Sequence, residues 1–487
     1  MEDLAFLSKF IVIVGENIME TKKVSIIHYL IVFALCFLFR FIPGFAGITT
    51  LGMGILGSFL GAIYGWIAID MLWPSIMALV GIGLSIGMNQ MYAASIGSLT
   101  IICLIFCMPL IGICNETGAF NWLINKLLTN KTMQGKAWLT IWVILMIAWI
   151  MGPFNPIIMA IIFCAFSTQI FKQVGVQKNE KLPIFMYIGI AYAAMMGQIL
   201  FPFMGTGLTL IMAYNNMFPD YPLDFIKYLL FMIPAGIVMV TIYVAIMKFV
   251  FRVDVSKVSE FKQQEKKVAI TKDQKKALFV FVVFMLLSVC SALPLGVVQT
   301  FLSQFNIGGI TLVMLAVVAL LKKEDGTPLC DIEAGLKNNN WGQITMVGYI
   351  MVVATYMNTP DTGIPAAMAM LLKPFMALPP IVFIIVALVF AALLTNFANN
   401  MIVIVLVMPF MFNFSQMIGM EPTGMICLLF LLSQFALMTP AASPVTAVCM
   451  TQEMADSNLM TKAAIKVVPI LFIIAIVLGW PFAQILF

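Results

Sequence analysis

Long apolar runs, separated by short polar segments, follow one another along almost the whole chain. A helix that crosses a bilayer needs about 20 consecutive apolar residues. The pattern predicts spans at residues 24–43, 50–69, 70–88, 98–115, 183–217, 224–250, 277–299, 304–321, 342–358, 424–450 and 466–486, and two further apolar pairs at 137–172 and 379–414. The sequence therefore predicts an all-α polytopic membrane protein with about 11 transmembrane helices.

The two apolar pairs are interrupted at their centres by polar residues, glycine and proline, which are unfavourable in contact with lipid. Gly152 to Pro156 divide residues 137–172, and Thr395 to Asn400 divide residues 379–414. A buried amide without a partner costs about 2–7 kcal/mol, and non-helical backbone at membrane depth occurs only inside protein or beside a watery cavity. Each interruption is therefore predicted to be the tip of a re-entrant hairpin that points at a binding site.

Composition and charge place these elements in a membrane. Hydrophobic residues make up 62% of the 487 residues and charged residues 10%, whereas soluble domains are about 25% charged. The net charge of +5 comes from basic loops and does not indicate a nucleic-acid surface. A multi-pass protein of the cell (plasma or inner) membrane is expected, with the lipid bilayer as its surroundings.

The distribution of Lys and Arg predicts the orientation, because basic loops stay on the cytoplasmic side. Basic residues gather at Lys126–Lys136, Lys172–Lys181, Lys248–Lys276 and Lys462–Lys466, whereas Phe218–Asp224 and Gln416–Thr423 contain none. The hairpin 137–172 is therefore expected to enter from the cytoplasm and the hairpin 379–414 from outside. The N-terminus is predicted to be cytoplasmic.

Opposed hairpins predict an inverted repeat, and the sequence has landmarks in register. Asn155 follows Glu116 by 39 positions, and Asn400 follows Asp361 by the same 39. Gln198 and Gln434 lie in two further spans that Pro and Gly interrupt. The predicted organisation is an amphipathic segment 1–23, a first transmembrane helix 24–49, repeat 1 at 50–250, a cytoplasmic basic linker 251–276 and repeat 2 at 277–487.

The two interrupted spans add a second kind of break at membrane depth. Residues 197–207 read GQILFPFMGTG, and residues 439–444 read TPAASP. Each break leaves helix ends with unpaired N–H and C=O groups. The N-termini favour an anion, and freed carbonyls together with amide side chains can coordinate a cation such as Na⁺.

The second hairpin resembles a known signature. Thr395-Asn396-Phe397-Ala398-Asn399-Asn400-Met401, running on to Met408-Pro409, resembles the T-N-x-x-S-N-T motif of the divalent anion/sodium symporter family, within the ion transporter superfamily. Residues 440–446 resemble its P-V-A-T-P-P-N motif. Phe154-Asn155-Pro156 occupies the S-N-T place of the first repeat, and residues 202–207 resemble P-x-x-G-T-P. In each triplet only the asparagine is kept.

The resemblance implies a function and a site. It implies a secondary active transporter of a small anion, such as a dicarboxylate or other carboxylate, with Na⁺ as coupling ion and elevator-type alternating access in a homodimer. The residues that it places at the substrate are Asn155, Pro156, Thr206, Asn399, Asn400, Ser443 and Pro444. The residues that it places near Na⁺ are Asn155, Gly205, Asn400 and Ala442.

Other readings stay open at this point. An anion exchanger or a cation/proton antiporter of the same superfamily would share the fold, and the antiporter would need a carboxylate such as Glu116 or Asp361 in the transport path. We expect both acids to lie at hinges instead, where Thr117 and Thr362 cap the next short helix. An integral-membrane enzyme is the remote alternative, since the chain has one histidine and no acidic cluster inside its spans. We therefore expect no catalytic residues.

Overall fold

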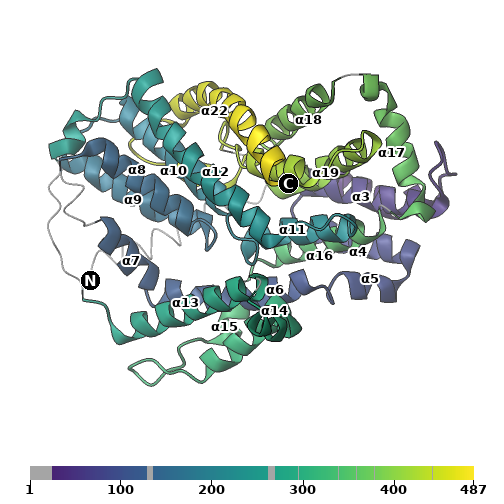
Figure 1. The fold of residues 1–487 in the computed structure, drawn as a ribbon, viewed down its shortest axis with the longest axis horizontal. Coiled ribbons are helices and arrows are strands. Elements are labelled where there is room, and N and C mark those ends of the chain that lie inside the picture. Colours follow the sequence, from purple (N-terminus) through teal and green to yellow (C-terminus); the bar gives the residue numbers. More distant parts are fainter. Residues whose placement is uncertain are drawn as a thin grey trace.

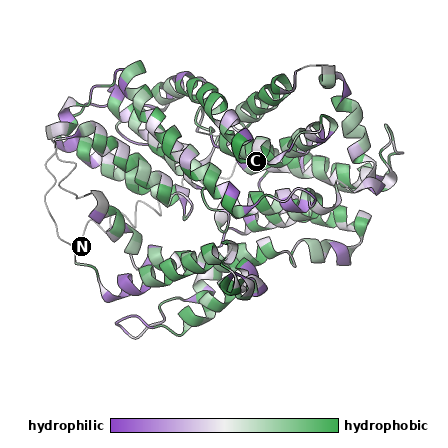
Figure 2. Cartoon of the chain, viewed as in Figure 1, coloured by the Kyte–Doolittle hydropathy of each residue, from purple (hydrophilic) through white to green (hydrophobic). Residues whose placement is uncertain are grey.

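The computed structural model describes residues 25–128, 135–260, 269–293, 295–337, 339–357, 359–377, 379–440 and 442–487. The regular elements of these residues are helices joined by loops, and none is a β-strand (Figure 1). The predicted amphipathic segment 1–23 lies outside the described residues. The predicted all-α fold is confirmed. Figure 2 shows hydrophobic residues along most of the helices and hydrophilic residues mainly at helix ends and in the loop before α15.

The first half of the chain supplies eleven α-helices to the described structure. They are α2 (Ile26–Phe33), α3 (Thr50–Ala68), α4 (Leu72–Ile86), α5 (Met88–Ala94), α6 (Leu99–Glu116), α7 (Ala119–Leu128), α8 (Ala137–Met151), α9 (Pro156–Gln173), α10 (Lys181–Gly197), α11 (Gly205–Met217) and α12 (Phe225–Ala245). The helix α2 runs on through η1 (Ala34–Leu38) and η2 (Phe39–Phe41), and α12 runs on through η4 (Ile246–Val250) to the short turn η5 (Ser256–Glu260).

The second half has the same kinds of element. They are α13 (Lys272–Ala292), α14 (Val297–Ala319), α15 (Ile332–Lys337), α16 (Trp341–Tyr356), η6 (Pro360–Thr362), α17 (Ile364–Leu372), η7 (Lys373–Ala377), α18 (Pro380–Leu394), α19 (Asn400–Met417), α20 (Thr423–Leu432), α21 (Pro444–Met450) and α22 (Ser457–Leu486).

The order of elements recurs in the two halves. A long helix and a short arm (α6–α7, α16–α17) precede a hairpin (α8–α9, α18–α19), a broken helix (α10–α11, α20–α21) and a long helix (α12, α22). The backbone agrees at matching joints: Gly118 and Gly363 both have φ of 68°, and Gly175 and Gly419 have φ of 69° and 67°. Glycine suits these joints because it alone adopts a left-handed conformation without steric cost. The assignment of the two halves as inverted repeats stays a prediction.

Several helices are longer than the apolar runs that predicted them. The helix α13 begins at Lys272 rather than 277 because Thr271 and Gln274 form a capping box, with N···O distances of 3.1 and 3.2 Å. The helix α22 begins at Ser457 rather than 466, where the Asp456 carboxylate accepts from Asn458 N–H at 2.9 Å. Side-chain caps extend a helix into polar sequence, so the apolar run marks only its lipid-facing part.

Eight helices in the described residues are long and apolar enough to cross a bilayer on their own. They are Thr50–Ala68, Leu99–Glu116, Pro156–Gln173, Phe225–Val250, Lys272–Ser291, Val297–Ala319, Asn400–Met417 and Ser457–Leu486. Five further apolar helices in the described residues are shorter, and three of them, Ala137–Met151, Lys181–Gly197 and Thr423–Leu432, end at or near predicted interruptions. The chain is therefore a multi-pass membrane protein, while the count of 11 spans stays a prediction.

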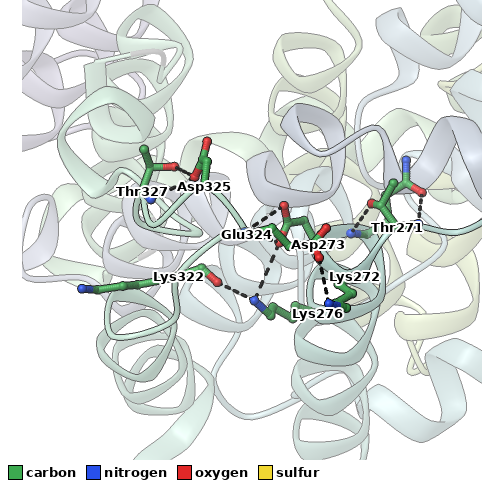
Figure 3. Close-up of polar contacts among 9 residues, drawn as sticks. Thr271, Lys272, Asp273, Lys276, Lys322, Glu324, Asp325 and Thr327 are labelled. Carbon is green, nitrogen blue, oxygen red and sulfur yellow. Dashed lines mark hydrogen bonds and ion pairs between the residues drawn. The ribbon is translucent and has the colours of Figure 1, made fainter.

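A polar cluster joins the start of α13 to the loop that follows α14 (Figure 3). Lys272 pairs with Glu324 at 3.1 Å, and Lys276 donates to the Lys322 carbonyl at 2.6 Å. Asp273 accepts from the Glu324 N–H at 3.1 Å. These contacts place the two ends on one polar side of the structure, as expected for an antiparallel helix pair whose basic ends face water.

Candidate functional site

The first hairpin tip lies against the first broken helix through a pair of glycines. A Cβ on Gly152 would stand 2.5 Å from the Ala194 carbonyl oxygen and 2.9 Å from Gly197 Cα. A Cβ on Gly197 would stand 2.1 Å from the Trp149 carbonyl oxygen. All three distances are shorter than a real Cβ contact, so the two backbones approach this closely only because neither residue has a side chain.

The residues after the first tip close it and start the returning helix. Asn155 caps α9: its Oδ1 accepts from Ile158 N–H at 3.0 Å, and Pro156 occupies the first helical position. Proline suits that position because its missing N–H would have had no helical partner. The Phe154 ring is 6% exposed and packs against Phe120 and Phe281, with ring centroids 5.0 and 4.7 Å away.

The first broken helix stops at Gly197 and restarts at Gly205. Gly205 has φ of 55° and lies beside the Pro153 carbonyl of the first tip, 3.2 Å from where its Cβ would be. Thr206 Oγ1 donates to Gln198 Oε1 at 3.5 Å, across the break. The break, its threonine and the first tip therefore lie together, as the sequence predicted for Gly205 and Thr206.

The second hairpin tip is fixed to the second broken helix by amide hydrogen bonds. Asn396 is 1% exposed; its Nδ2 donates to the Ala392 carbonyl at 2.8 Å, and its Oδ1 accepts from Met438 N–H at 2.9 Å. Thr439 Oγ1 donates to the Asn396 carbonyl at 3.0 Å. Asn399 caps α19, its Oδ1 accepting from Met401 N–H at 2.9 Å. The side-chain amides of Asn396 and Asn399 are therefore hydrogen-bonded, partly to the hairpin's own helices and partly to the second break.

Ser443 and Pro444 restart the second broken helix. Ser443 Oγ accepts from Thr446 N–H at 3.0 Å, and Pro444 is the first residue of α21. Ser443 Oγ also donates to the sulfur of Met195, on α10, at 3.3 Å. Ala442, expected near a cation, is buried beside them. The second break therefore reaches across to the first repeat.

Gln198 and Gln434 join the two breaks directly. Gln198 Nε2 donates to Gln434 Oε1 at 2.6 Å, although the residues are 236 positions apart, and Asn400 Nδ2 donates to the same oxygen at 3.2 Å. The chain of contacts therefore runs from Thr206 through both glutamines to Asn400. The sequence singled out the glutamines only as register landmarks. Their matching places in two broken helices were the signal that could have assigned them to the site.

Charged groups lie away from this centre. Among the side chains that the structure describes, no Asp, Glu, Lys, Arg or His is buried. Glu116 and Asp361 are exposed. Thr362 is the last residue of η6, and its Oγ1 accepts from Ile364 N–H at 3.2 Å, but the N-cap of α17 is Gly363. Thr117 Oγ1 donates back to the Ile113 carbonyl at 2.7 Å. The expectation that these threonines cap the next short helices is therefore not met: Gly363 is the N-cap of α17, and Thr117 is the C-cap of α6, with its hydroxyl bonded within that helix.

Two hairpins whose tips meet two broken helices at an uncharged polar centre define a membrane transporter. Comparison with known proteins agrees. The sequence model of the citrate transporter family matches residues 59–433, and the chain belongs to that family. It is accordingly a membrane transporter and not an enzyme. The resemblance to the divalent anion/sodium symporters is confirmed at this level.

A solved structure has a similar fold. The YdaH transporter of Alcanivorax borkumensis, whose crystal structure "reveals an unusual topology", superposes with a TM-score of 0.54 at 12% sequence identity, over 83% of this chain and 88% of that one. At this identity the likeness concerns the fold alone. A sequence search of curated proteins finds no match.

Proposed function

We propose that the protein is a secondary active transporter of a small carboxylate of the citrate class, coupled to Na⁺, in the cell membrane with its N-terminus in the cytoplasm. The observation that carries the proposal is the line of contacts that joins Thr206, Gln198, Gln434 and Asn400 between the two breaks. The family to which the chain belongs is described as citrate transporters, which supports the substrate class.

The lack of buried charge supports coupling to a cation. A carboxylate that enters this centre meets amides, hydroxyls and helix N-termini, and each N-terminus contributes only about 0.3–1 kcal/mol, or up to ~2 where partly buried. Removing an ion from water costs several kcal/mol, so a multiply charged anion needs a compensating charge that the described side chains do not supply. A co-bound Na⁺ near Asn155, Gly205, Asn400 and Ala442 would supply it.

The same observations weigh against a proton antiporter. A proton carrier needs a titratable group in the transport path, and the two candidate acids, Glu116 and Asp361, are exposed at the joints before the short arms. We propose alternating access of the elevator type in a homodimer, following the resemblance to the divalent anion/sodium symporters.

Uptake of radiolabelled citrate into proteoliposomes with an inward Na⁺ gradient tests the proposal. Asn155→Ala and Asn400→Ala are each expected to abolish uptake while the purified proteins stay monodisperse. The matched control is Asn413→Ala, which removes an amide from α19 whose Nδ2 donates to the Pro409 carbonyl at 2.8 Å. Normal uptake by both tip variants would overturn the site assignment.

Side-specific labelling tests the opposed hairpins. Ile157→Cys, at a 37% exposed position just after the first tip, is expected to react with an impermeant maleimide from the cytoplasmic side. Phe397→Cys, at a 74% exposed position in the second tip, is expected to react from outside. A Cys290→Ser background removes the one native cysteine that is not buried; all nine lie in the described residues. Reaction of both positions from one side only would contradict the predicted topology.

A further inference from the structure

The side-chain oxygen of Gln434 accepts two hydrogen bonds, one from each half of the chain. Gln434 has no exposed surface. Its Oε1 accepts from Gln198 Nε2 at 2.6 Å and from Asn400 Nδ2 at 3.2 Å, while its Nε2 donates to the Phe430 carbonyl at 3.1 Å. An amide oxygen has two lone pairs. Both are therefore taken, and the donor bond to α20 fixes which end of the Gln434 amide faces the hairpin.

This arrangement also fixes the amide of Asn400. Its nitrogen must face Gln434, since an oxygen there would meet another oxygen, and its Oδ1 is therefore turned away. Asn400 is 7% exposed, and its Oδ1 has no hydrogen-bond partner among the described residues. Buried acceptors are nearly always paired. The position is thus suited to an electropositive group that the protein itself does not provide.

The first hairpin tip has no asparagine that matches Asn400 in leaving its side-chain oxygen unpaired. Asn155, which the spacing matches to Asn400, uses its Oδ1 to cap α9. Gln198, which the register matches to Gln434, directs its Nε2 across to Gln434. The two repeats therefore differ: the first supplies a donor that holds Gln434, and the second leaves an acceptor free.

We infer that Gln434, held by Gln198, is a positioning residue that sets the polarity of a subsite at the second hairpin tip. By taking the N–H of Asn400, it presents the Asn400 oxygen to an electropositive group, which is either a desolvated cation or a hydroxyl of the bound substrate. The inference deepens the proposed function and rests on it, because both candidate groups belong to the transported species. A carboxylate oxygen is disfavoured at this point, since it would face another oxygen.

Three variants separate this role from a merely structural one. Gln434→Leu removes the acceptor at similar volume and lets the Asn400 amide turn over. Gln434→Glu, in its neutral form, keeps a carbonyl acceptor and a donor toward Phe430. Ser433→Ala is the matched control, because this buried neighbour donates only to the Leu429 carbonyl, within its own helix.

Equilibrium binding to the purified full-length protein, by scintillation proximity, tests the inference with two probes: Na⁺, and citrate compared with propane-1,2,3-tricarboxylate, which lacks the hydroxyl. If the group is a cation, Gln434→Leu raises the half-saturating Na⁺ concentration by about tenfold, the loss expected for one hydrogen-bonded contact to a charge. If it is the substrate hydroxyl, Gln434→Leu instead removes the preference for citrate. Gln434→Glu and Ser433→Ala retain wild-type values in both cases.

The inference is overturned if Gln434→Leu binds both probes like the wild type, or if Gln434→Glu is impaired as much as Gln434→Leu. A wild type that binds neither Na⁺ nor citrate overturns it together with the proposed substrate class. A wild type that binds both but does not carry citrate across proteoliposomes overturns the proposed transport alone.

Discussion

The two hairpin tips occupy matching places in the chain but are held in different ways. The first tip is fixed by shape: Gly152 lies against Gly197, and Phe154 is buried among aromatic rings. The second tip is fixed by amide hydrogen bonds to the second break, and Phe397 at its turn is 74% exposed. The first hairpin also has an ion pair, Lys172 with Glu453, whereas the second has no charged residue between 380 and 417.

This difference between the tips indicates which of them can change its contacts when a ligand binds. Interlocked backbones have one close arrangement, because any separation leaves unfilled space. Hydrogen bonds from a tip to a broken helix can instead be exchanged for bonds to a ligand or to water at little net cost. We therefore expect the first tip to be the rigid wall of the site and the second tip to be the part that responds to ligand.

The largest expected effect is at the glycine contact. Gly197→Ala places a Cβ 2.1 Å from a backbone oxygen, so α8 and α10 must move apart. We expect the free energy of unfolding to fall by about 3 kcal/mol, or the variant to fail to fold. Thermal unfolding in detergent measures it. Gly112→Ala in α6 is the control, since its nearest neighbour would be 3.9 Å away. Equal behaviour of the two variants would show that the first tip is not held by shape.

Truncation of the two phenylalanines compares the tips directly. Phe154→Ala removes a buried ring from its aromatic cluster and is expected to lower the free energy of unfolding by about 3 kcal/mol. Phe397→Ala removes an exposed ring and is expected to change it by less than about 0.5 kcal/mol. Thermal unfolding of both variants is the measurement. A larger loss at Phe397 would reverse the comparison.

A small effect is also expected in the loop after the first hairpin. The Lys257 ammonium, 2.9 Å away, and the Gln177 N–H hold the pKa of Glu180 below its ordinary value. Since the folded pKa is the lower one, this contribution is present above the unfolded pKa and is lost as the pH falls through the folded pKa. Glu180 is 36% exposed, so Glu180→Gln should lower the free energy of unfolding by less than about 1 kcal/mol at pH 7. The difference from wild type should vanish in acid; a constant difference would contradict the assignment.

Much of the fold was predictable from sequence because lipid imposes strict rules on it. Apolar runs predicted the helices, and proline and glycine predicted where they break. Helix starts such as Lys272 and Ser457 were missed, because caps lie in polar sequence outside the apolar run. The recurrence of glycine conformations at Gly175 and Gly419 was also missed, since a lone glycine in a loop is a weak signal.

The site was predictable as a place but not as a set of contacts. The tips and breaks were predicted, and Thr206, Asn400 and Ser443 lie where they meet. The bridge between Gln198 and Gln434 needs the two halves to be placed against each other, which periodicity cannot do. Nor does spacing reveal that Asn155 and Asn399 serve as helix caps, so that of these three hairpin-tip asparagines Asn400 is the one whose side-chain oxygen has no partner among the described residues.

The most direct test of the central claim, a carboxylate site completed by Na⁺, is thermal unfolding of the wild-type protein with citrate in NaCl and in choline chloride at equal ionic strength. A ligand at 100 times its Kd adds about 2.7 kcal/mol to the free energy of unfolding. We predict that citrate raises the unfolding temperature only when Na⁺ is present. An equal rise in choline chloride would contradict the claim, because it would show that the site holds the anion without the cation.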